Sequence, residues 1–92
     1  MKVYAVVESY QWYKGADTTL WGVHKTIEGA KKCLRDAIEE LYEGYFLDKD
    51  EDEIEEFIES RFVETDGDIA HWFDEDDDAV RQMYISETEL ED

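Results

Sequence analysis

The chain lacks proline, contains one cysteine and five glycines, and has no long apolar run. Its single Cys33 excludes an intrachain disulfide and favours a reducing, intracellular setting. Because no run approaches 18 apolar residues, no membrane-spanning helix is expected. The N-terminal residues have a strand pattern rather than that of a signal peptide. With no proline-rich linker, residues 1–92 predict a single small domain, which we expect in the cytoplasm.

Motifs for catalysis and for metal binding are also scarce. His24 and His71 are each isolated, and no H-x-x-x-H or C-x-x-C spacing is present. There is no G-x-S-x-G motif and no glycine-rich phosphate loop. Carboxylates are so numerous that choosing a general acid and base among them would be arbitrary. We therefore predict a protein that is not an enzyme, without catalytic residues or a cofactor.

Positive charge is scarce, and negative charge is concentrated in one half of the chain. Residues 1–47 hold six Lys/Arg and seven Asp/Glu, a net of −1, whereas residues 48–92 hold three and twenty, a net of −17. Direct binding to nucleic acid or to anionic membranes is disfavoured, because phosphate neutralisation needs Lys and Arg. Such self-repulsion adds no stability, so the asymmetry predicts a basic partner. The alternative is an acidity that only maintains solubility.

The residue pattern predicts an α+β domain. With 42% hydrophobic residues and thirteen aromatic ones, the chain is too apolar for a disordered acidic tail. Thr26 is a predicted N-cap for the first helix, whose apolar residues repeat at three and four. The predicted elements are strands over 2–10 and 18–25, helices from Ile27 to about Gly44 and over 50–63, and strands over 69–73 and 79–86. This ββααββ order predicts an antiparallel sheet covered on one face by two helices, with a strand order that the sequence does not reveal.

The second predicted helix carries an acidic face opposite its apolar stripe. Like charges four residues apart on a helix, such as Asp52 with Glu56 and Glu55 with Glu59, destabilise it by roughly 0.2–0.5 kcal/mol per pair. A local cost without a folding benefit indicates function. The step between such residues is about 6 Å, and phosphates on one strand of a duplex lie about 3.4 Å apart along the axis. A row of these carboxylates therefore roughly matches every second phosphate.

Two further acidic clusters follow, a run over 74–78 at a predicted hairpin tip and the last acids of the chain, Glu87, Glu89, Glu91 and Asp92. Aromatic residues beside the run could anchor a partner, since Trp and Tyr dominate interface energetics, although aromatics in a small domain are more often core. The predicted partner-binding residues are Asp52, Glu55, Glu56, Glu59, Trp72, Asp74, Asp76, Asp77, Asp78 and Tyr84.

A calcium site is an alternative for residues 48–59. Asp48, Asp50, Asp52 and Glu59 occupy positions 1, 3, 5 and 12 of an EF-hand loop. Position 6 is Glu53, where the turn of that loop needs glycine. We therefore predict no dedicated metal site and keep a weak calcium-binding module as the alternative.

Two segments resemble known proteins. Lys2-Val-Tyr-Ala-Val-Val and Trp21-Gly-Val-His-Lys-Thr-Ile-Glu-Gly-Ala-Lys-Lys resemble small uncharacterised phage and prophage proteins of Gram-positive bacteria, and Tyr84-Ile-Ser-Glu-Thr-Glu-Leu-Glu is similar to their last strand. The acidic stretch 48–78 lies outside this resemblance. In size and acidity the chain also resembles phage-encoded DNA mimics and anti-CRISPR proteins, which implies no particular residues. Together these features predict a phage-encoded inhibitor of a basic nucleic-acid-binding host defence protein, such as a CRISPR effector or a restriction-type nuclease.

Overall fold

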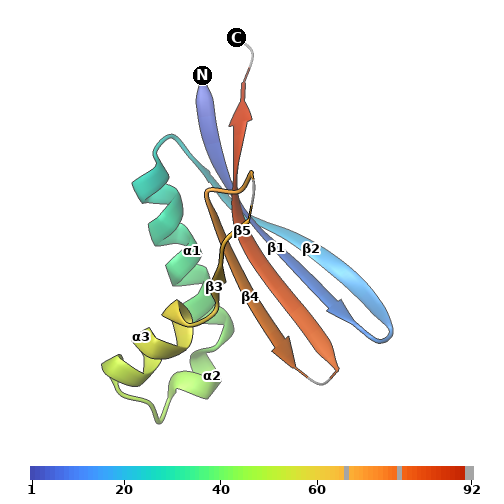
Figure 1. Cartoon of the computed structure of the whole chain (residues 1–92), viewed down its shortest axis with the longest axis vertical. Coiled ribbons are helices and arrows are strands. Elements are labelled where there is room, and N and C mark those ends of the chain that lie inside the picture. Colours follow the sequence, from blue (N-terminus) through green and yellow to red (C-terminus); the bar gives the residue numbers. More distant parts are fainter. Residues whose placement is uncertain (66, 77, 91–92) are drawn as a thin grey trace.

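A five-stranded antiparallel sheet, in the order β2-β1-β5-β4-β3, carries helices on one of its faces (Figure 1). The computed structural model describes residues 1–65, 67–76 and 78–90. The elements are β1 (Lys2–Trp12), β2 (Gly15–His24), α1 (Ile27–Leu41), α2 (Glu43–Phe46), α3 (Glu51–Glu59), β3 (Phe62–Val63), β4 (Ala70–Asp76) and β5 (Ala79–Glu89). No helix among the described residues is long and apolar enough to cross a membrane.

The predicted fold class is confirmed: the domain is α+β, with an antiparallel sheet and helices on one face. Two short elements are additional. The helix predicted from Ile27 breaks at Tyr42, whose backbone leaves the helical region (φ −109°, ψ 18°), and the four-residue α2 follows. The helix predicted over 50–63 ends at Glu59, and Phe62 and Val63 form β3 instead, a strand too short to show a periodicity. Most of the acidic run belongs to β4 rather than to a loop.

Side-chain caps fix the start of both main helices. Thr26 accepts a hydrogen bond from the Gly29 amide at 3.0 Å, as its predicted N-cap role requires. Asp50 accepts one from the Glu53 amide at 2.9 Å and so begins α3. The acids in the first turn of α3 suit the positive end of the helix dipole. The sequence therefore places these acids where a helix tolerates them.

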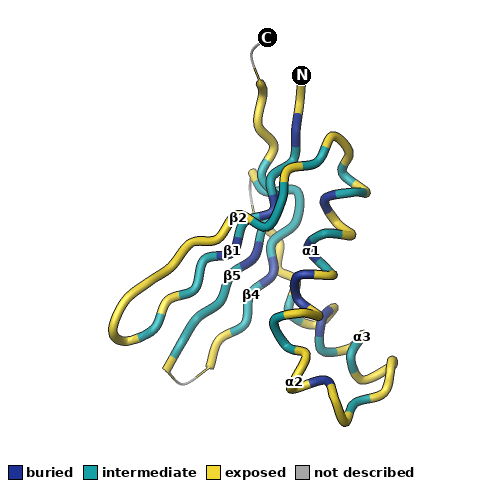
Figure 2. The backbone as a smooth tube through the Cα atoms, turned by 180° about the vertical axis from the view of Figure 1, so that it is seen from behind, coloured by how far each residue is buried: buried dark blue, intermediate teal, exposed yellow. Residues whose placement is uncertain are grey.

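The core lies between the sheet and the helices (Figure 2). At its centre is Trp72 of β4, which is fully buried and donates a hydrogen bond from Nε1 to the Ile58 carbonyl oxygen at 2.8 Å. This bond joins α3 to the sheet. The other buried apolar residues of the cluster are Val6, Ala30, Leu34, Ala37, Ile38, Phe46, Ile58, Met83 and Ile85.

Strand register assigns each side chain to one face of the sheet. Glu8 pairs with Met83, which pairs with Trp72, so all three lie on the helix side. Residues of opposite parity, such as Tyr84, lie on the face that carries no helix. There the Tyr84 ring stacks on His71, with centroids 5.8 Å apart.

Candidate functional site

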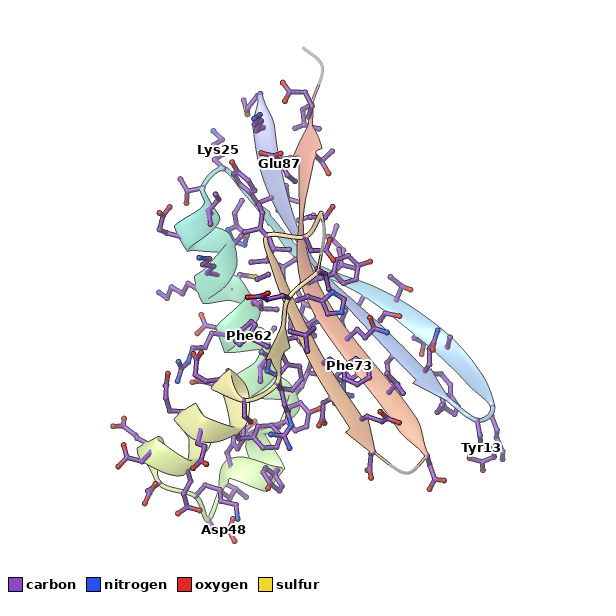
Figure 3. The ribbon with its side chains drawn as sticks, in the orientation of Figure 1. Tyr13, Lys25, Asp48, Phe62, Phe73 and Glu87 are labelled. Atoms are coloured by element: carbon purple, nitrogen blue, oxygen red, sulfur yellow. The ribbon has the colours of Figure 1, made fainter. Side chains whose placement is uncertain are left out.

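The acidic clusters occupy two ends of the molecule. The helix α3 and the β4–β5 tip both lie at the end opposite the chain termini (Figures 1 and 2). Figure 3 shows Asp48 at that end and Glu87 at the other. We call the first group the acidic end, and its exposed carboxylates are Asp48, Asp50, Glu51, Asp52, Glu53, Glu55, Glu56, Glu59, Glu75, Asp76 and Asp78. Two of the three predicted clusters therefore share one end, and the third does not.

The acids at the other end have cationic neighbours. Glu87 pairs with Lys2 at 3.6 Å, and Glu89 pairs with the α-amino group of Met1 at 3.1 Å. These pairs hold the first and last described strands together at the termini. Glu91 and Asp92 lie outside the described residues.

On α3, three of the four predicted contact residues present unpaired charge. Asp52, Glu56 and Glu59 are exposed and make no ion pair with any Lys or Arg of the described chain. Glu55 differs, because Arg35 of α1 forms an ion pair with it and holds the pKa of its carboxyl below the usual range. Of the four predicted residues on this face, Glu55 therefore has a compensating cation.

Asp74 was expected at an exposed hairpin tip, and the structure corrects this. It lies within β4 on the helix side, where Arg61 Nε donates a hydrogen bond to its Oδ1 at 2.9 Å. The Tyr42 hydroxyl donates to its Oδ2 at 2.5 Å. Because both carboxylate oxygens are engaged, Asp74 links β4 to the end of α1 and is not available to replace a phosphate.

The contacts of Asp74 with Arg61 and Tyr42 form one polar network, and a second polar network lies beside it. Glu8 is 6% exposed and accepts hydrogen bonds from Trp21 Nε1 at 2.9 Å and from Arg81 Nε at 3.0 Å. The Arg81 guanidinium also lies 4.6 Å from the Tyr10 ring centroid and 5.3 Å from that of Tyr42. The two networks thus meet at Tyr42, between the sheet and the end of α1.

The predicted aromatic anchors do not lie at the acidic surface. Trp72 is fully buried, so it is a core residue and its prediction as a partner contact is wrong. Tyr84 is partly exposed, but it lies on the sheet face that carries no helix. At the β4–β5 tip, Asp76 and Asp78 are exposed, and Asp77 lies outside the described residues.

The helix α3 also bears on the calcium alternative. Because the helix begins at Glu51, Asp52 and Glu59 are seven residues apart along a helix, about 10 Å, and do not converge on one ion. Asp50 is engaged as the N-cap. The described residues hold no group of three or more side chains placed to bind a metal.

The remaining candidate for chemistry is the single thiol. Cys33 is half-buried, and its pKa is raised by burial and by the neighbouring Asp36. A raised pKa leaves less thiolate, which is the nucleophilic form.

No protein-family model, curated protein or solved structure matches this chain.

The Tyr42 hydroxyl gives a testable pH dependence. Burial, together with the hydrogen bond to Asp74, raises its pKa to about 12, against an ordinary value near 10. Since the folded pKa exceeds the unfolded one, this stabilisation is complete below about pH 10 and is lost as the pH rises through about 12. We expect the stability difference between wild type and Tyr42→Phe to change only in this range, as measured by urea unfolding at pH 8 to 12. A constant difference would contradict the assignment.

Proposed function

We propose that this chain is a phage-encoded inhibitor that acts in the cytoplasm of the bacterial host. It binds a basic nucleic-acid-binding defence protein, with a CRISPR effector or a restriction-type nuclease as the favoured target. Its acidic end takes the place of nucleic-acid phosphates and occludes the cationic groove of the target. The observation that carries the proposal is the presence of α3 and the β4–β5 tip at one end, with exposed carboxylates that few cations balance.

The spacing on α3 supports the mimicry. Asp52, Glu56 and Glu59 are separated by four and three residues, which corresponds to steps of about 6 Å and 4.5 Å along the helix. Successive phosphates on one duplex strand lie about 3.4 Å apart along the axis. The row therefore offers charge at intervals between one and two phosphate steps, to which long Lys and Arg side chains of a target groove can adapt.

The arrangement of cations supports a directed field. Of the arginines, Arg35, Arg61 and Arg81 each bind a carboxylate within the protein. Lys25 lies at the end opposite Asp48 (Figure 3), and Lys49, which follows Asp48 in the sequence, lies 5.2 Å from the Tyr45 ring centroid. The uncompensated negative potential is therefore strongest at the acidic end, where it steers a positively charged groove toward α3.

The test replaces the three unpaired α3 acids by neutral isosteres, Asp52→Asn, Glu56→Gln and Glu59→Gln. Each exposed charge pair contributes about 0.5 kcal/mol, so the loss of three pairs should weaken binding of the triple variant to its target about tenfold. Binding is measured against purified guide-loaded CRISPR effectors and restriction nucleases, with duplex DNA as competitor, at several salt concentrations. The wild-type affinity should fall with salt, and that of the variant should fall less steeply.

A matched control changes the net charge equally at exposed acids elsewhere, with Asp36→Asn, Glu64→Gln and Glu87→Gln. This variant should bind within about threefold of wild type, because charges at surface sites away from an interface contribute little. Equal losses in both triple variants would indicate a net-charge effect rather than an interface. If wild type neither competes with DNA nor inhibits any of these nucleases at low salt, the proposal fails and acidity for solubility is favoured.

A further inference from the structure

The β1–β2 hairpin projects away from the helices and carries aromatic side chains at its tip (Figure 3). The rings of Tyr10 and Trp12 stack with centroids 5.4 Å apart and 28° between their planes. Arg81 covers Tyr10 as described above. At the turn, Tyr13 is 79% exposed, and the Lys14 ammonium lies 5.3 Å from its ring centroid. Tyr10 and Tyr13 therefore each have a cation from within the chain over the ring.

Trp12 is the exception. It is partly exposed, and no cation of the described residues lies over its indole. Trp is the strongest of the three aromatic side chains in cation–π contacts. The outer member of the stack is thus the ring best suited to a cation and lacks one.

The register around Trp12 places a small residue on each side of it. Trp12 pairs with Gly15 on one side and with Ala79 on the other, and Ala79 pairs in turn with Asp76. The indole packs over Gly15, where an added Cβ would lie 3.4 Å from the ring, so this side of the ring is filled. On the other side Ala79 carries only a methyl group on the same sheet face. In the next row Asp17 pairs with Tyr10, and Asp78 is exposed at the adjacent turn. Strands lie about 4.8 Å apart, so these carboxylates are within reach of a group bound beside the indole.

We propose that Trp12 and the neighbouring Ala79 form a seat for an arginine side chain of the basic protein that the acidic end recruits. The inference rests on the proposed function and names the chemistry of the partner. A guanidinium is planar, stacks on aromatic faces and is more weakly hydrated than an ammonium, so it fits this seat better than lysine does. Carboxylates around the seat provide charge complementarity at its rim.

The direct test uses protein in which 5-fluorotryptophan replaces the three tryptophans, so that each gives a separate ¹⁹F signal. The probes are an arginine-rich peptide and a lysine-rich peptide of equal length and charge. We expect the Trp12 signal to shift on addition of the arginine peptide while that of buried Trp72 does not. The arginine peptide should bind at least threefold more tightly than the lysine peptide.

Two variants locate the seat. Trp12→Ala should weaken binding of the arginine peptide about fivefold and abolish the preference over lysine, whereas Tyr13→Ala at the same tip should keep that preference. Ala79→Leu fills the space beside the indole without removing the ring, and should also abolish the preference. Circular dichroism and thermal unfolding confirm that each variant is folded.

The outcomes separate this inference from the proposed function. If the Trp12 signal is unmoved, or Trp12→Ala binds both peptides as wild type does, the seat is refuted even if the α3 variant loses nuclease binding. The triple α3 variant should weaken both peptides alike and retain the arginine preference. If the triple α3 variant instead lost the preference for the arginine peptide over the lysine peptide, the arginine contact would lie on α3 and the seat at Trp12 would be refuted. Failure of nuclease inhibition together with an intact arginine preference would refute only the proposed function.

Discussion

Replacing Trp72 by alanine is expected to lower the free energy of unfolding by about 3–5 kcal/mol. The indole is fully buried among Tyr42, Phe57 and Met83, and its N–H bonds to the Ile58 carbonyl oxygen. Removing it creates a cavity and leaves that oxygen unpaired. Since small domains are stable by about 5–15 kcal/mol, the variant should be close to unfolded at 37 °C. Urea unfolding followed by circular dichroism measures the loss.

Two controls separate the cavity from the hydrogen bond. Trp72→Phe keeps most of the apolar volume but loses the N–H, and should cost about 1–3 kcal/mol. Trp12→Ala removes an indole that is partly exposed, and should cost about 1 kcal/mol or less of folding stability. If Trp72→Ala were as stable as Trp12→Ala, the central position of Trp72 between α3 and the sheet would be wrong.

The sequence predicts most of the fold because its signals are local. Thr26 and Asp50 are side-chain caps, and the apolar residues after each repeat with helical spacing. The first helix begins at Ile27 as predicted, and the second begins at Glu51, one residue after its predicted start. The break at Tyr42 and the two-residue β3 were not predictable, because the first depends on packing against Asp74 and Arg81, and the second is shorter than any periodic pattern.

The candidate site was predictable only in part. The α3 acids were predicted to lie opposite an apolar stripe, and the structure exposes all four of them. The ion pair of Glu55 with Arg35 joins residues twenty positions apart, which a helical pattern cannot reveal. The inward orientation of Asp74 was predictable from the alternation of side chains along a strand. Asp74 lies two residues after buried Trp72 and so shares its face of the sheet. The run of five consecutive acids has the composition of a loop, and this composition hides the alternation.

The same phase argument applies to Glu8, which lies two residues after buried Val6. A carboxylate at a strand position that faces the core requires a partner, and here the partner is Arg81. Replacing Arg81 by alanine should therefore destabilise the protein by about 2–4 kcal/mol, because Glu8 is left buried with only the Trp21 N–H. Arg35→Ala, which breaks a surface pair, should cost about 1 kcal/mol or less.

The double variant Glu8→Met with Arg81→Met tests whether the charges stabilise the fold or only each other. Replacing a buried ion pair by apolar groups of similar volume is often neutral or stabilising, so we expect the double variant to recover most of the loss of Arg81→Met alone. Urea unfolding of the two single variants and the double variant gives the coupling energy. A double variant as unstable as the sum of the singles would show that the pair is not coupled. Arg81 also stacks on Tyr10, next to Trp12. A double variant that regains stability but binds the arginine peptide poorly would therefore show that Arg81 positions the aromatic stack for its partner.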